Sequence, residues 1–192
     1  MMRRFLTPTV AILLSGLVMT GALAWLVIDR IALLSSGREI VLAIRPVDPR
    51  DLFKGDYVRL AFDVSEIDKA LLPDDETRRG ERRFGPGATI PLYVVIERQP
   101  DESWKPVAVS ETQPSGLSAN RVFLKGKTQW HSRRRVLYGI ERYYVQEGTG
   151  LALENLARTS KLAAIVAVGR DGSTAIKGLV VDGRRVYDEP LL

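Results

Sequence analysis

A long uncharged stretch near the N-terminus is the feature that most constrains how this chain can fold. No side chain between Arg4 and Asp29 carries a charge. Thr7 and Pro8 fit the N-cap and the first residue of a helix, because proline lacks only a donor that would be unpaired there. From Pro8 to Ile28 a helix would be about 31 Å long, close to the ~30 Å hydrocarbon core of a bilayer. Residues 8–28 are therefore predicted to form a transmembrane helix, with the lipid bilayer as its first partner.

The charges that flank this stretch predict its orientation. Arg3 and Arg4 precede the span, and positive residues favour the cytoplasmic side. Residues 1–7 are thus expected in the cytoplasm, and the rest of the chain outside the cytoplasmic (inner) membrane, in the periplasm. Trp25 suits the far interface. Residues 29–37 are expected to extend the helix by a turn or two and to end it at Gly37.

A cleaved secretory signal is the alternative interpretation of the same stretch. Ala22-Leu23-Ala24 is an acceptable small-x-small cleavage site. However, the apolar run continues to Ile28, whereas a removed signal usually has an apolar core of only about 7–15 residues. A retained anchor is therefore favoured, and either alternative places the domain outside the cytoplasm.

Residues 38–192 are predicted to form one β-rich domain. Apolar alternation and turn formers indicate strands joined mainly as antiparallel hairpins. We expect a mainly β (α+β) fold, an antiparallel sandwich or partly open barrel with one or two short helices. The expected strands are 38–46, 56–64, 90–98, 104–112, 120–127, 134–145 and a terminal meander over 161–187; the expected helices are 65–72 and 151–159, and 74–87 is an expected loop.

Composition excludes several kinds of site. The chain has no cysteine, so disulfides, thiolate nucleophiles and cysteine metal ligands are ruled out. His131 is the single histidine, and no metal site or cofactor is predicted; the alternative is a carboxylate-only Ca²⁺ site at Asp48, Asp51 and Asp56. Beyond residue 28 the chain has 26 basic and 23 acidic residues, so its net charge there is a weak argument for a polyanionic partner. Nucleic acid would lie on the other side of the membrane and is not expected as a partner.

The most specific string is IRPVDPRDLFKGDYVRLAFDVS, residues 44–65. Pro46 and Pro49 favour an extended, non-helical backbone at the start of the string, and Gly55 suits a turn with positive φ. Asp56 can cap that turn through its carboxylate, and a strand is expected to begin at Tyr57. Read from the residues alone, Gly55 and Asp56 form a turn.

This string resembles the motif of the GDYXXLXY family, small bacterial membrane-anchored proteins without an assigned activity. The matching positions are Gly55, Asp56, Tyr57, Leu60 and Phe62. Phe62 stands where the family has tyrosine, which indicates that the hydroxyl does no obligatory chemistry here. YGIERYYVQEG, residues 138–148, is similar to a second family element. The resemblance implies a single-span anchor, a non-cytoplasmic domain and a setting beside multi-spanning membrane proteins, but no mechanism.

The leading functional hypothesis is a binding or assembly module acting with another integral membrane protein. The face that bears Tyr138, Arg142 and Tyr144 is a possible interface, and Glu141 and Glu147 are possible site residues beside it. No catalytic residue is predicted.

A hydrolase-like enzyme is the alternative hypothesis. One version is a degenerate site similar to that of type I signal peptidases, with Lys125 or Lys127 as the base, although the expected serine is missing. The other is a carboxylate pair drawn from Asp56, Glu141 and Glu147.

Overall fold

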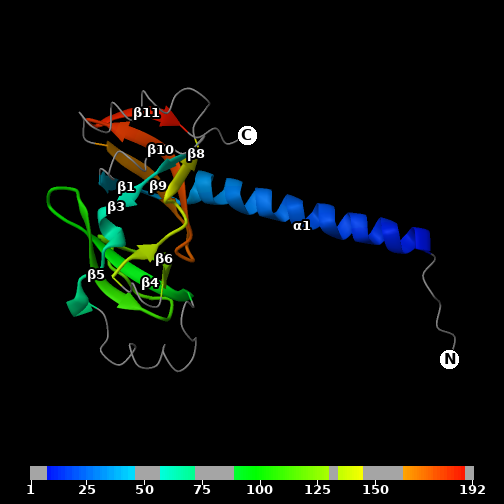
Figure 1. Ribbon diagram of the computed structural model, residues 1–192, viewed down its shortest axis with the longest axis horizontal. Helices are drawn as coiled ribbons and strands as arrows, with labels where there is room; N and C mark the ends of the chain where they lie inside the picture. Colours follow the sequence, from blue (N-terminus) through cyan, green and yellow to red (C-terminus); the bar gives the residue numbers. More distant parts are fainter. Residues whose placement is uncertain (1–7, 46–56, 72–88, 130–133, 145–161, 189–192) are drawn as a thin grey trace.

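The computed structural model describes residues 8–45, 57–71, 89–129, 134–144 and 162–188. A single long helix, α1, projects from a body of β-strands (Figure 1). Within the described residues, α1 is the one helix long and apolar enough to cross a membrane, with a mean hydropathy of 2.2 over its best window.

Helix α1 spans Pro8–Ser36 and has two parts with different surroundings. The side chains of residues 9–30 are exposed, whereas the last turns pack against β9 and β10. Leu34 is buried there, at 6% exposure. The helix ends where the Gly37 N–H donates to the Leu33 carbonyl at 2.9 Å. Helix α1 therefore continues past Ile28 and ends at Ser36, directly before Gly37.

Five strands form the first sheet, in the order β11-β10-β9-β1-β3. Every pairing in it is antiparallel. The three C-terminal strands follow one another as the predicted meander. The strands are β1 (Arg38–Arg45), β3 (Ala61–Phe62), β9 (Leu162–Val168), β10 (Thr174–Val181) and β11 (Arg184–Asp188).

Four strands form the second sheet, in the order β5-β4-β6-β7, and β2 pairs with β8 in a separate two-stranded ribbon. The predicted hairpin between β4 and β5 is confirmed, as is the pairing of β6 with the segment after it. The strands are β2 (Tyr57–Arg59), β4 (Thr89–Arg98), β5 (Trp104–Ser110), β6 (Arg121–Gln129), β7 (Val136–Leu137) and β8 (Arg142–Tyr144).

One hydrophobic core joins the sheets. Ile40 and Leu42 of β1 belong to the same buried cluster as Val94 of β4 and Leu124 of β6. Because successive strand residues point to opposite faces, Val41 between the first two is 48% exposed. The mainly β, antiparallel fold with a single N-terminal helix is therefore confirmed.

Two predicted strands are each divided in the structure. Residues 57–62 form β2 and β3, which pair with different partners, β8 and β1. Residues 134–145 were expected as one strand, but Gly139 at φ +84° turns the chain between β7 and β8. Positive φ is accessible to glycine without strain, so the strand ends there.

The short helix expected at 65–72 is also corrected. Two 3₁₀ turns, η1 (Asp63–Ser65) and η2 (Lys69–Leu71), flank an extended Glu66 that bridges to Arg135. Because the extended backbone at Glu66 pairs with the distant Arg135, residues 65–72 do not form one continuous α-helix. The loop 74–87 and the helix 151–159 lie outside the described residues.

Candidate functional site

Tyr138 lies where the sheets meet, and it ties three segments together: η1, β10 and the β7–β8 turn. Its hydroxyl donates to the Val64 carbonyl at 2.7 Å, and its own carbonyl accepts from the Thr174 hydroxyl at 2.9 Å. Its N–H donates to a Glu141 carboxylate oxygen at 2.5 Å. Loss of hydration on burial, and secondarily the Glu141 charge, raise the pKa of the Tyr138 phenol far above its usual range. The hydroxyl is thus a permanent donor holding η1 against β7.

Glu141 caps the turn that separates β7 from β8. One carboxylate oxygen accepts from Tyr138 N–H, and the other accepts from Gly139 N–H at 2.9 Å. Its carbonyl accepts from Leu60 N–H at 2.9 Å. A carboxylate that accepts backbone donors in this way stabilises a turn. The structure therefore gives Glu141 a positioning role at this junction.

A basic groove lies beside this junction. Its cavity measures about 940 Å³, and its lining includes Lys125 and Lys127 from β6 together with Arg135 and Arg142. Glu141 is the single acidic residue among the described lining residues, and both its oxygens accept backbone N–H groups. Cations therefore outnumber carboxylates among the described lining residues, and the groove suits an anionic ligand or segment.

Apolar side chains line the same groove. Leu60, Pro91 and Leu137 contribute to its wall, and Leu137 is 38% exposed. The groove thus offers both steering charge and contact area.

Close packing fixes the shape of the groove at Gly126. A Cβ at this position would meet the Leu137 carbonyl and the Tyr138 ring, both at 3.0 Å. On the same strand, Lys125 N–H donates at 2.8 Å to the carbonyl of Gly172, in the β9–β10 turn. Strand β6 is therefore held on one edge by β4 and on the other by β7 and this turn.

Two hydroxyl groups in the groove, those of Ser173 and Thr174, are engaged in hydrogen bonds. Ser173 donates to Asp171 at 2.6 Å, and Thr174 donates to the Tyr138 carbonyl. The Ser173 hydroxyl and the backbone N–H of Ser173 lower the pKa of the Asp171 carboxyl, which burial partly opposes. These are turn and strand-joining contacts. The described residues contain no group of three or more His, Cys, Asp or Glu side chains that would hold a metal ion.

The family-type motif and the second string form one unit in the structure. Tyr57 pairs with Tyr144 in the β2–β8 ribbon, and Leu60 N–H reaches the Glu141 carbonyl. Phe62 is 1% exposed in the core, in agreement with a purely apolar role. Of the predicted site and interface residues, the structure brings Leu60, Tyr138, Glu141 and Arg142 to the basic groove.

Other predicted residues lie outside the described ranges. These are Gly55, Asp56, Glu147, Asp48, Asp51 and His131. Sequence reasoning missed Gly126, Arg135 and Thr174 as parts of the groove. A glycine inside a strand marks close approach of another segment, so Gly126 was the signal that could have located it.

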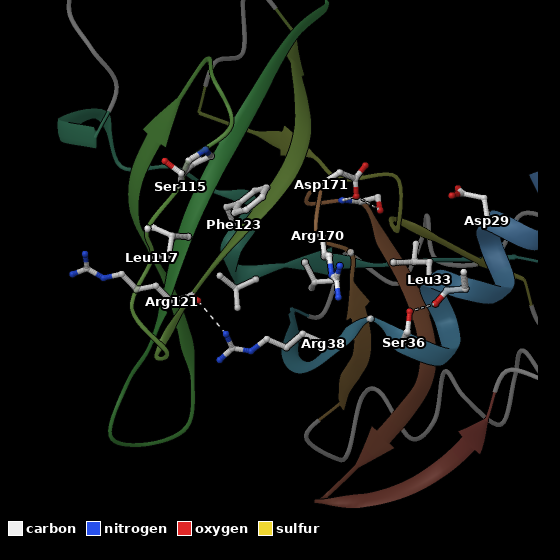
Figure 2. Close-up of a pocket in the computed structure, with 18 residues that line it drawn as sticks. Asp29, Leu33, Ser36, Arg38, Ser115, Leu117, Arg121, Phe123, Arg170 and Asp171 are labelled. Atoms are coloured by element: carbon white, nitrogen blue, oxygen red, sulfur yellow. Dashed lines mark hydrogen bonds between the residues drawn. The ribbon is translucent and has the colours of Figure 1, made fainter.

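A second cavity lies between the end of α1 and the β4–β6 sheet (Figure 2). This cleft measures about 930 Å³. One wall is the last part of α1, from Asp29 to Gly37, and the opposite wall includes Phe123 and the 114–117 segment. Arg38 crosses its floor, with one guanidinium nitrogen donating to the Arg121 carbonyl at 3.2 Å.

The fold and these sites define a class: a mainly β domain carried on one N-terminal apolar helix. The family model described as GDYXXLXY protein matches residues 19–179, and the chain belongs to this family. The resemblance drawn from Gly55–Phe62 is thereby confirmed. Comparisons with curated proteins and with solved structures found no match.

Proposed function

We propose that the protein is a membrane-anchored binding or assembly module of the inner membrane, with its N-terminus in the cytoplasm and its β domain in the periplasm. The exposure of α1 carries this proposal. Large apolar side chains such as Leu13, Leu17 and Leu26 are each more than 60% exposed, around the whole helix. A helix that is apolar on every side needs an apolar solvent, which the bilayer supplies.

The end of the helix supports retention of the anchor. Helix α1 runs without a break through Ala24 to Ser36, and its last turns pack against β9 and β10. Cleavage after Ala24 would leave Trp25, Leu26 and Ile28 exposed to water on a short free helix. An uncleaved chain keeps these residues in lipid.

Cell fractionation and reporter fusions test the anchor. The full-length chain is expected in the membrane fraction after alkaline extraction, and a C-terminal alkaline phosphatase fusion is expected to be active. A mature soluble form that begins at Trp25 would contradict the anchor, and an inactive fusion would contradict the orientation.

We infer that the partner is another integral membrane protein and that it docks at the basic groove. Lys125, Lys127 and Arg135 provide charge for steering, while Leu137 provides apolar contact beside them. Complementary charge raises association rates and selects against wrong partners. An acidic segment of the partner is the chemistry that this lining fits.

Photocrosslinking in native membranes tests the docking site. A photoreactive residue at Leu137 is expected to give an adduct with a membrane protein, whereas one at Val186, exposed on β11, is expected to give much less. Lys125→Glu with Lys127→Glu should abolish the Leu137 adduct; Lys105→Glu, on β5, is the matched control. Recovery of the protein alone from Leu137 would overturn the proposal.

A further inference from the structure

The cleft in Figure 2 runs along the helix, starting where the charged residues begin. Asp29, Ala32, Leu33 and Ser36 line it, so it follows the same face of α1 through successive turns. From Asp29 to Gly37 the helix rises about 12 Å. Asp29 is the first charged residue after the apolar span. In an anchored protein the near end of the cleft therefore opens into the headgroup layer, which is roughly 5–8 Å thick on each side of the hydrocarbon core.

Apolar side chains form part of each wall of the cleft and continue the apolar surface of the helix. Leu33 lies on the α1 side, and Leu117 and Phe123 lie on the opposite side (Figure 2). A volume of about 930 Å³ falls in the range of small-molecule sites, roughly 300–1,000 Å³. The space thus suits a molecule with an apolar body that enters from the bilayer.

A cation is placed inside the cleft without an acidic partner. Figure 2 shows Arg170 between α1 and Phe123. Its side chain is exposed and forms no ion pair with any residue in the described part of the chain. Arg121, in contrast, pairs with Glu97 at 3.3 Å. Arg170 is therefore the guanidinium available for an incoming anion, and planar guanidinium groups bind phosphate well.

The other charges at the cleft limit the ligand to one of low net charge. Arg38 adds positive charge, but its guanidinium already donates to the carbonyls of Arg121 and Ala119. Asp29 and Asp171 also line the cleft, and Asp171 is engaged with Ser173. Two carboxylates would repel a polyanion, whereas a single phosphate beside Arg170 is tolerated.

We propose that this cleft binds one phospholipid of the outer leaflet, with its phosphate at Arg170 and its acyl chains along α1 and the Leu117–Phe123 wall. This proposal rests on the proposed anchoring of α1 in the membrane. The lipid would fill the space between helix and domain and would fix the angle at which the domain stands on the bilayer.

Single-cysteine labelling tests the proposal, since the chain has no cysteine of its own. A fluorophore is attached at Leu117→Cys in the cleft, at Val18→Cys in the middle of the apolar span 8–28, or at Val186→Cys on β11. Each full-length protein is placed, one copy per nanodisc, in phosphatidylethanolamine and phosphatidylglycerol containing spin-labelled phospholipids. The spin label is carried on the headgroup in one set and on the acyl chain in the other.

We expect acyl-chain quenching at Val18, quenching by both labels at Leu117, and little quenching at Val186. Arg170→Gln should raise the spin-labelled lipid needed for half-maximal quenching at Leu117 by about tenfold, because a charge-assisted hydrogen bond is lost. Arg184→Gln, on β11, removes the same charge elsewhere and should leave quenching at Leu117 unchanged.

The controls separate this proposal from the anchoring on which it rests. Quenching at Val18 without quenching at Leu117 would overturn the lipid site and keep the anchor. Absence of quenching at Val18 would overturn the anchor itself. If Leu117 is quenched but Arg170→Gln does not change that quenching, the cleft is only a surface near the membrane, and the proposed phosphate site at Arg170 is wrong.

Discussion

Removal of one oxygen atom from Tyr138 tests whether the second family string builds the fold. In Tyr138→Phe the ring keeps its packing, while the Val64 carbonyl loses the donor 2.7 Å away. The site is buried, with Tyr138 at 6% exposure, so water cannot replace that donor without rearrangement. Leaving one buried partner unsatisfied costs about 1–3 kcal/mol. For a protein of this size the melting temperature should fall by roughly 2–12 °C.

The measurement is thermal unfolding of the full-length protein in detergent, followed by near-ultraviolet circular dichroism. Tyr93→Phe is the matched control: Tyr93 packs edge-on against Phe123 with ring centroids 5.8 Å apart. Its hydroxyl forms no hydrogen bond with the described residues, so this substitution should cost less than about 0.5 kcal/mol.

Two results would refute this reasoning. Equal stability of Tyr138→Phe and Tyr93→Phe would mean that the hydroxyl does not hold η1 to β7. A Tyr138→Phe protein with unchanged stability but a lost Leu137 crosslink would assign Tyr138 to partner binding and not to the fold.

Folding raises the pKa of Tyr138, so the stabilisation of the folded state by the neutral phenol is fully present below the unfolded-state pKa near 10 and is lost as pH rises beyond it. The difference in unfolding free energy between wild type and Tyr138→Phe should therefore narrow above about pH 10. Gly37→Ala would place a Cβ 2.5 Å from a backbone carbonyl and should destabilise the helix–domain joint by about 1–3 kcal/mol, seen as faster trypsin cleavage there, whereas Gly21→Ala meets open space and should be neutral. Glu141→Gln keeps one of two acceptor oxygens and should lower unfolding stability by about 1–3 kcal/mol relative to the exposed control Glu111→Gln; equal melting temperatures would contradict the capping role.

Sequence reasoning succeeded where the structural signal is local. The helix follows from one uncharged run, and hairpins such as β4–β5 follow from alternation across a short turn. It failed where strands are only two or three residues long, as in β3 and β7, because so few residues carry no periodicity. Their existence depends on partners distant in sequence, such as Ile44 opposite Phe62.

The basic groove was beyond sequence reasoning for the same physical reason. Lys125 and Lys127 share a strand, so their common face is readable from the period of two. Arg135 reaches the groove because β7 pairs with β6, and Arg142 reaches it only after Gly139 turns the chain between β7 and β8. The net charge of the whole chain, +5, gave no indication of this local concentration.

The arrangement of the two family strings bears on where function should be sought. Leu60 and Phe62 are buried, and Leu60 N–H is fixed by the Glu141 carbonyl, so these motif residues hold the second string in place. The second string in turn presents Arg142 to the groove, while Glu141 is occupied with backbone donors. Substitutions at the buried motif positions should therefore first change stability, and an effect on partner binding would follow from loss of the groove's shape. Substitutions of the exposed cations Lys125 and Lys127 leave that shape intact, and they are the ones that report on binding itself.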